Sequence, residues 1–254
     1  MNKRRILSPV AAGLALLAVG HAASAAELPS VVIVHGAFAD GSDWAKVIAL
    51  LQAKGVQVTA VQNGLESLAS DVATTRRVVE NQKGRVVLVG HSWGGTVITD
   101  AGQADKVAAL VYVAAFAPDA GQSTAELGKG YPVPPGIASL VADAKGYLSL
   151  PAPALARDFA QDVPPAQAAV MAATQGPIQA RAFDDKTTGA AWQTRPSWYV
   201  VSSDDRMISP DLVRAMARKI GARVTTLPTS HVPQQSRPEE VAEVILAAVS
   251  ASTK

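Results

Sequence analysis

The sequence predicts an α/β protein built on one mostly parallel sheet of about six strands, with helices covering both faces. Several short runs of apolar residues show no alternation with polar positions, as expected for strands that are buried on both sides. Segments with the 3.6-residue periodicity of amphipathic helices separate most of these runs, and strands that alternate with helices form parallel sheets with right-handed crossovers. The ligand site of such a sheet is expected at the carboxyl ends of its strands. The six expected strands cover residues 31–34, 56–61, 86–89, 107–115, 198–202 and 223–227.

Each helix expected between these strands carries one apolar face. The predicted helices cover about residues 44–54, 65–82 and 210–220, with a further helix face that includes residues 96–101 and a last helix after Pro238. The pattern changes between Pro118 and Pro196, which contains ten of the sixteen prolines and no long apolar strand run. We therefore expect an inserted cap over about residues 119–191, with short helices near 154–161 and 166–173 and a stiff, irregular stretch at 131–135.

The N-terminus has the layout of a cleavable secretory signal. Three basic residues are followed by an apolar run over 10–19 and by Ala23-Ser24-Ala25. This pattern predicts a signal peptide over residues 1–25 and a single mature domain over 26–254, exported to the periplasm or outside the cell. Removing residues 1–25 takes away three bases and no acid, which moves the formal net charge from +2 to −1.

Composition narrows the class of partner. The small mature charge gives no sign of a nucleic-acid partner, and after the signal no apolar run is long enough to span a membrane. The chain has no cysteine, so disulfides, thiolate nucleophiles and zinc-thiolate sites are excluded. We expect no metal and no cofactor, and the oligomeric state is left open.

The chemistry is expected at Gly90-His-Ser-Trp-Gly94, where the buried run 86–89 leads into a helix. A G-x-S-x-G sequence between a strand and a helix is typical of a nucleophile elbow, which exposes a serine on a tight turn. The alternative is a glycine-rich turn with an idle serine. The strand before Ser92 and the apolar helix after it favour the elbow.

A serine hydroxyl needs a base, and His231 is the best candidate among four histidines. His21 falls in the signal, His35 follows the first strand, and the side chain of His91, directly before the serine, is expected to point away from the hydroxyl. His231 lies in the loop after the last strand, from where it can reach the elbow. Its alternative role is that of an ordinary loop histidine.

An acid must orient that base. Asp204 and Asp205 both follow the strand at 198–202, and the order serine, acid, histidine matches the triad order of one known hydrolase fold. Asp205 is preferred over Asp204, which could instead cap the turn, and Asp119 is a third candidate. The oxyanion hole is assigned to the backbone N–H groups of Ala37 and Trp93. A plain strand-to-helix connection is the alternative for the turn that holds Ala37.

With these motifs, the chain resembles the α/β-hydrolase superfamily, and within it the small capped serine hydrolases similar to plant methylesterases, hydroxynitrile lyases and their bacterial esterase relatives. The resemblance covers residues 30–250, and its motifs are His35–Trp44, Gly90–Gly95, Pro196–Tyr199, Asp205–Ile208 and Ser230-His231. It implies the α/β-hydrolase fold and supports Asp205 as the acid. Lyase members carry a lysine after the catalytic histidine and a threonine in the oxyanion loop. Here those positions hold Val232 and Ala37, which argues against cyanohydrin cleavage.

The sequence thus predicts a carboxylesterase-like serine hydrolase that cleaves small to medium carboxylic esters through an acyl-enzyme on Ser92. The expected partner is a small-molecule ester. Alternatives are a hydrolase of lactones or amides, a C–C lyase on the same triad, and a non-catalytic binding protein. Phe38, Phe116 and Tyr131 are the principal candidates for the substrate pocket under the cap. Further candidates for its wall are Trp93, Phe159 and Met171.

Overall fold

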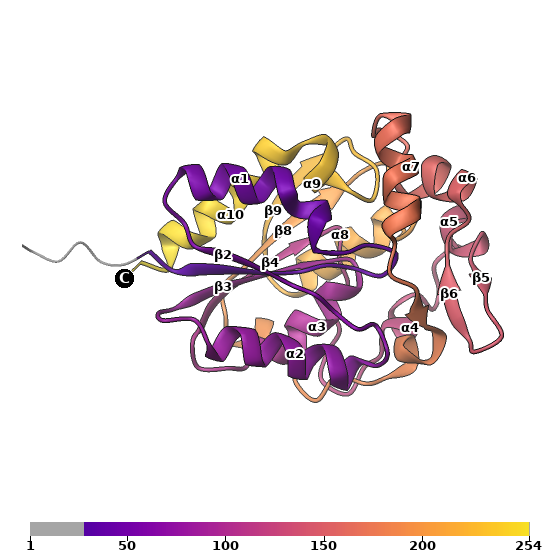
Figure 1. Ribbon diagram of the computed structural model, residues 1–254. Coiled ribbons are helices and arrows are strands. Elements are labelled where there is room, and N and C mark those ends of the chain that lie inside the picture. The colour runs from indigo at the N-terminus through magenta and orange to yellow at the C-terminus, as the bar shows by residue number, and fades with distance from the viewer. Residues whose placement is uncertain (1–27, 254) are drawn as a thin grey trace, which may run out of the picture.

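A computed structural model describes residues 28–253, which form a six-stranded parallel sheet covered by helices on both faces (Figure 1). The predicted signal peptide lies outside the described residues. The strand order is β2-β1-β3-β4-β8-β9, so the chain passes from β1 to β2 at one edge, returns to β3 on the other side of β1, and continues through β4 and β8 to β9 at the other edge. The six strands are β1 (Ser30–Val34), β2 (Val58–Val61), β3 (Val86–His91), β4 (Val107–Val113), β8 (Ser197–Ser202) and β9 (Arg223–Leu227).

The central strands are buried on both faces, which explains their continuous apolar sequences. Along β3, Val86 and Leu88 belong to one core cluster, while Val87 and Val89 belong to the other. Successive side chains of a strand point to opposite faces, so each apolar pair contributes to a different core. The predicted sheet of about six strands and its double covering are confirmed.

Two sets of helices form the outer layers (Figure 1). One core cluster takes its helical residues from α1 (Ala45–Ala53) and α10 (Pro238–Ala251). The other core cluster includes residues of α2 (Leu68–Glu80), α3 (Trp93–Ala101) and α8 (Pro210–Lys219), together with residues of short helices between β4 and β8. The start of α2 is set by Ser67, whose side chain accepts a hydrogen bond from Ser70 N–H, so this helix begins three residues later than the predicted 65.

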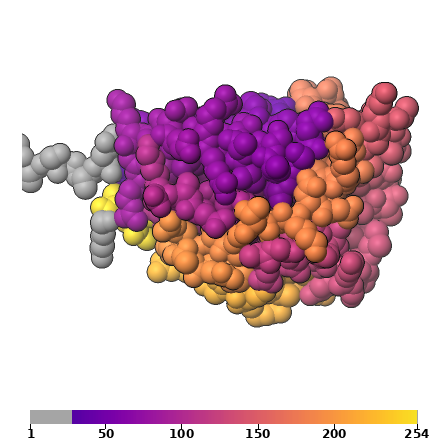
Figure 2. Space-filling view, turned by 90° about the horizontal axis from the view of Figure 1, so that it is seen from below, coloured from indigo at the N-terminus to yellow at the C-terminus, as the bar shows by residue number. Residues whose placement is uncertain are grey.

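The segment between β4 and β8 lies beyond the carboxyl ends of the strands. In Figure 2 most of its residues gather at one end of the molecule, away from the end of the C-terminal helix. Its helical elements are α4 (Thr124–Leu127), α5 (Pro135–Ala138), α6 (Ala152–Ala154), the π-helix η2 (Leu155–Phe159), α7 (Pro165–Thr174) and two 3-10 turns, η3 (Ala180–Asp184) and η4 (Ala191–Gln193). We refer to residues 118–196 as the cap.

The cap also contains a small antiparallel sheet that the sequence did not indicate. It consists of β5 (Val141–Ala142), β6 (Tyr147–Ser149) and β7 (Ile178–Gln179), with β6 in the middle. Strands of two or three residues are too short to show a period, so no pattern in the sequence predicts them. The remaining short elements of the chain are the 3-10 turn η1 (Gly41–Trp44) and α9 (Pro233–Ser236).

Candidate active site

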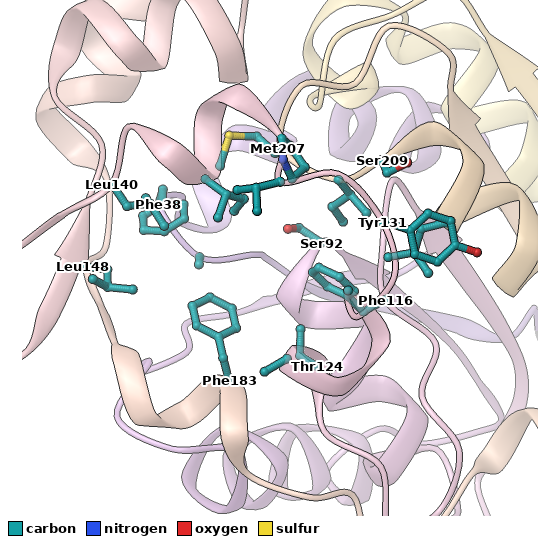
Figure 3. A pocket seen from close by; sticks show the side chains of 18 of the residues that line it. Phe38, Ser92, Phe116, Thr124, Tyr131, Leu140, Leu148, Phe183, Met207 and Ser209 are labelled. Carbon is teal, nitrogen blue, oxygen red and sulfur yellow. The ribbon is translucent and has the colours of Figure 1, made fainter.

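Ser92 occupies a strained turn between β3 and α3. Its backbone dihedrals are φ 52° and ψ −119°, which residues with a Cβ atom rarely adopt. A Cβ on Gly94 would overlap the carbonyl oxygen of Val34 on the neighbouring strand, so this turn can close against β1 only with glycine at that position. The turn holds Ser92 at the carboxyl end of the sheet, and Figure 3 shows its side chain pointing into a cavity.

His231 and Asp205 form a buried pair. His231 Nδ1 lies 2.8 Å from Asp205 Oδ2, and each side chain is at most 1% exposed. Asp205 Oδ1 accepts hydrogen bonds from the backbone N–H groups of Met207 at 2.7 Å and Ile208 at 3.0 Å. Because an ionised carboxylate only accepts, His231 Nδ1 must be the donor, and Nε2 of the neutral ring is then left as a proton acceptor.

The other two candidate acids do not contact His231. Asp204 is exposed, and its backbone N–H donates to the carbonyl of Thr229 at 3.2 Å. Asp119 forms an ion pair with Lys219, with Oδ2 and Nζ 3.1 Å apart. Of the three carboxylates weighed from the sequence, Asp205 is the one that the structure brings to the histidine.

Ser92 and His231 come from loops that lie against each other at the end of β3. His91 Nε2 donates to the carbonyl oxygen of His231 at 2.8 Å, and the two imidazole rings lie 4.8 Å apart. Within residues 28–253, no hydrogen bond joins Ser92 Oγ to His231 Nε2. Hydrogen bonds of this kind are often long without substrate and tighten when it binds. Proton transfer requires the hydroxyl and the ring to form this hydrogen bond.

The remaining described histidines have structural roles. His35 Nε2 accepts from Asn63 N–H at 2.9 Å, so Nδ1 carries the hydrogen that reaches the carbonyl of Gly36 at 2.8 Å. Burial lowers the pKa of His35. Burial, reinforced by neighbouring His231, lowers the pKa of His91 well below its usual value. Both rings are therefore neutral and hold the loops that flank Ser92.

Two backbone N–H groups flank the serine. A Cβ on Gly36 would lie 2.8 Å from Ser92 Cβ, so the turn that holds Ala37 passes directly beside the nucleophile. Trp93 is the first residue of α3. Neither the Ala37 nor the Trp93 N–H donates to a protein acceptor within the described part of the chain. Unpaired N–H donors beside a serine are the kind of group that can bind a negative oxygen.

Ser92 opens into an apolar cavity of about 310 Å³ between the sheet and the cap (Figure 3). The three principal pocket candidates, Phe38, Phe116 and Tyr131, all line it. Trp93, Phe159 and Met171 do not line it. Further apolar residues, mostly from the cap, line the cavity, and nothing in the sequence marks them as pocket residues. They are Ala125, Pro132, Val133, Pro134, Ile137, Leu140, Leu148, Phe183, Met207, Ile208 and Leu212.

Two of the wall candidates that do not reach the cavity have other contacts. The indole N–H of Trp93 donates to the buried carboxylate of Asp71 at 2.9 Å, and its ring meets Phe183 edge to face. Burial raises the pKa of Asp71, and the hydrogen bond from the indole opposes that rise. The ring of Phe159 meets His231 edge to face, with centroids 5.1 Å apart. Both aromatic residues thus pack against neighbours of the site and do not line the cavity.

Comparison with known proteins gives the family. The model of the alpha/beta hydrolase family matches residues 31–244, which is most of the chain. The chain belongs to the alpha/beta hydrolase family. The fold and the resemblance predicted from the sequence are therefore confirmed.

The relatives of this chain include a pyrethroid hydrolase and plant methylesterases. A pyrethroid hydrolase of Sphingobium wenxiniae is 28% identical over 257 residues, which cover 85% of each chain. Methylesterase 2 of Arabidopsis thaliana is 37% identical over 109 residues, which cover 35% of this chain and 40% of the relative. These relatives support ester hydrolysis in general terms.

Solved structures show the same fold. The crystal structure of a pyrethroid hydrolase from Sphingobium faniae superposes with a TM-score of 0.74 at 23% identity, covering 89% of this chain and 98% of the other. Tomato methylketone synthase I, solved with 2-tridecanone, superposes with a TM-score of 0.75 at 17% identity, covering 89% and 99%. At such identities the likeness concerns the fold alone. Within residues 28–253, no helix is both long and apolar enough to cross a membrane.

Proposed function

We propose that this protein is a serine hydrolase that cleaves uncharged carboxylic esters of small to medium size through an acyl-enzyme on Ser92. The observation that carries the proposal is the buried His231–Asp205 pair at the end of the sheet where the strained Ser92 opens into an apolar cavity. The names of the relatives agree with this class of reaction.

In the first half of the reaction, the Ser92 hydroxyl attacks the acyl carbon while His231 Nε2 takes its proton. Asp205 holds the ring in the required tautomer and stabilises the imidazolium that forms. The N–H groups of Ala37 and Trp93 stabilise the oxyanion of the tetrahedral intermediate. His231 then gives the proton to the leaving alcohol. Water, activated by the same ring, releases the acid and restores the serine.

The lining and volume of the cavity favour uncharged esters of limited size. Its lining is almost wholly apolar, and its volume of about 310 Å³ lies at the lower end of the range for small-molecule pockets. A charged acyl or alcohol group would lose its hydration there without gaining a partner. We expect kcat/KM for p-nitrophenyl butyrate to exceed that for p-nitrophenyl hemisuccinate by about 10- to 100-fold, since an unpaired polar group costs about 1–3 kcal/mol.

The test of the mechanism is the Ser92→Ala variant. It should lose hydrolysis of p-nitrophenyl butyrate by several orders of magnitude, while its thermal unfolding stays cooperative. A variant that kept the wild-type rate would show that another group carries the reaction. Labelling of the wild-type enzyme by a fluorophosphonate separates a hydrolase from a binding protein, because a binder with an unactivated serine stays unlabelled.

The same assays distinguish other bonds. Lactones, anilides and cyanohydrins belong in the substrate panel because the triad alone does not select among them. The residue after His231 is the fully buried Val232, and Ala37 has no side-chain hydroxyl. These two positions favour ester hydrolysis over cyanohydrin cleavage.

A further inference from the structure

One short cap segment, residues 158–162, contacts both the ring of the catalytic base and the backbone next to it. It follows α6, begins within the π-helix η2 and ends just before α7. Asp162 Oδ2 accepts a hydrogen bond from the backbone N–H of Ser230 at 2.8 Å. The fully buried ring of Phe159 packs edge to face on His231, with centroids 5.1 Å apart. The segment thus holds both the ring of the base and the peptide that precedes it.

The same segment holds the loop of the catalytic acid. Gln161 Nε2 donates to the carbonyl of Asp204 at 2.7 Å, directly before Asp205. The wholly buried Asp158 places its Oδ1 3.0 Å from Nε of Arg206, directly after Asp205. The acid is therefore fixed through both of its chain neighbours.

The buried carboxylate of Asp158 makes it costly to displace this segment from the loop of the acid. Its second oxygen, Oδ2, accepts from Nε and Nη2 of Arg157 at 3.0 and 2.6 Å. The backbone carbonyl of Arg206 also accepts from Gly136 N–H at 3.0 Å, so cap residues hold Arg206 at two points. Because a buried carboxylate is costly without partners, displacing this segment would separate Asp158 from Arg206 and leave the adjacent Arg157 as its charged partner. The π-helix, a rare turn that is frequent at functional sites, presents these side chains together.

We propose that residues 158–162 form a positioning clamp that holds His231 and Asp205 in register with Ser92, so that the cap aligns the acid and base besides roofing the cavity. Asp162 and Phe159 are positioning residues for the base, and Asp158 for the acid. None of them lines the cavity that receives the substrate. Loss of the clamp should therefore lower kcat with little effect on KM, because it changes the alignment of reacting groups and not substrate contacts.

The first test compares Asp162→Ala with Asp162→Asn. The amide oxygen of asparagine can still accept from Ser230 N–H, whereas alanine cannot. We expect the alanine variant to lose about 10- to 100-fold in kcat, as a misplacement of the base by up to 1 Å would cause. The asparagine variant should stay within about twofold of the wild type, on the same argument.

Asp185→Ala is the matched control. Asp185 is also a cap carboxylate that accepts from a backbone N–H of the main domain, that of Leu68 at 2.9 Å, but it does not touch the acid or base loops. If cap attachment in general controls the rate, the two alanine variants will lose kcat equally, and the clamp proposal fails. If the clamp acts on the base, Asp185→Ala will keep kcat near the wild-type value.

A spectroscopic measurement makes the test independent of turnover. The clamp rests on the proposed function, in which His231 Nδ1–H donates to Asp205. The low-field proton NMR signal of that hydrogen should broaden or shift in Asp162→Ala and in Phe159→Leu, and stay unchanged in Asp162→Asn and Asp185→Ala. An unchanged signal in both Asp162→Ala and Phe159→Leu would overturn the clamp even if Ser92→Ala confirmed the hydrolase. Conversely, a shifted signal in an enzyme whose Ser92→Ala variant stays active would refute the mechanism and leave the clamp standing.

Discussion

Replacing Asp205 by asparagine tests how the acid controls the base. In the structure, Asp205 accepts three hydrogen bonds, two from the N–H groups of Met207 and Ile208 and one from His231. The amide oxygen of asparagine can keep the two backbone bonds, so the loop should stay in place. The amide nitrogen then faces His231 Nδ1 and donates to it, which moves the ring hydrogen to Nε2. In that tautomer His231 cannot take the proton of Ser92.

We therefore expect Asp205→Asn to lower kcat by about 10⁴, the size of effect seen when a triad acid is replaced by its amide. This fall corresponds to about 5.5 kcal/mol of activation free energy. The free energy of unfolding should fall by much less, about 1–3 kcal/mol, since one charge-assisted hydrogen bond changes. Steady-state hydrolysis of p-nitrophenyl butyrate and urea unfolding measure the two quantities. Asp204→Asn, on the exposed neighbour, is the control and should leave kcat unchanged. A loss below tenfold in Asp205→Asn would refute the tautomer argument.

Three further predictions concern stability, the elbow and export. Burial, with the nearby charge of Asp40, raises the pKa of Asp43 from 3.8 to about 7. Between these values the folded protein keeps a proton that the unfolded chain has lost, so this carboxyl lowers stability as pH rises. Asp43→Asn should therefore raise the free energy of unfolding at pH 8 by up to about 4 kcal/mol relative to its effect at pH 4, measured by urea unfolding. Equal effects at both pH values would contradict this. Gly94→Ala should abolish activity and lower the melting temperature, because its Cβ meets the Val34 carbonyl, whereas Gly84→Ala, where a Cβ meets nothing within 4 Å, should do neither. Finally, we propose export of the protein after cleavage near Ala26, which N-terminal sequencing of the exported form would check; an exported chain that still begins at Met1 would exclude the cleavage.

The sheet could be predicted because its central strands are buried on both faces. Val31–Val34 and Val86–Val89 are continuous apolar runs, and that pattern reflects burial more than local propensity. The end of β4 was predicted less accurately. The apolar run continues to Ala115, but Ala114 adopts a φ of 42° and the strand stops at Val113. Composition gives no information about such a change in backbone direction.

The residues of the site also divide into those that the sequence predicted and those that it did not. Chain order and motif spacing singled out Ser92, Asp205 and His231, and the structure brings the last two into contact and places the first at the same end of the sheet. The contacts of Phe159 and Asp162 could not be found in this way, because both residues lie about 70 positions before the loop that they hold. Phe159 is equally apolar whether it lines a pocket or packs on a histidine, so its role required coordinates.

The most direct test of the account is covalent trapping of the nucleophile. The purified protein would be treated with diethyl p-nitrophenyl phosphate and analysed by intact mass and peptide mapping. We predict that one diethylphosphoryl group per chain appears on the peptide that carries Ser92, that ester hydrolysis is lost in proportion, and that Ser92→Ala is not labelled. Full activity without labelling, or a label on any residue other than Ser92, would contradict the account.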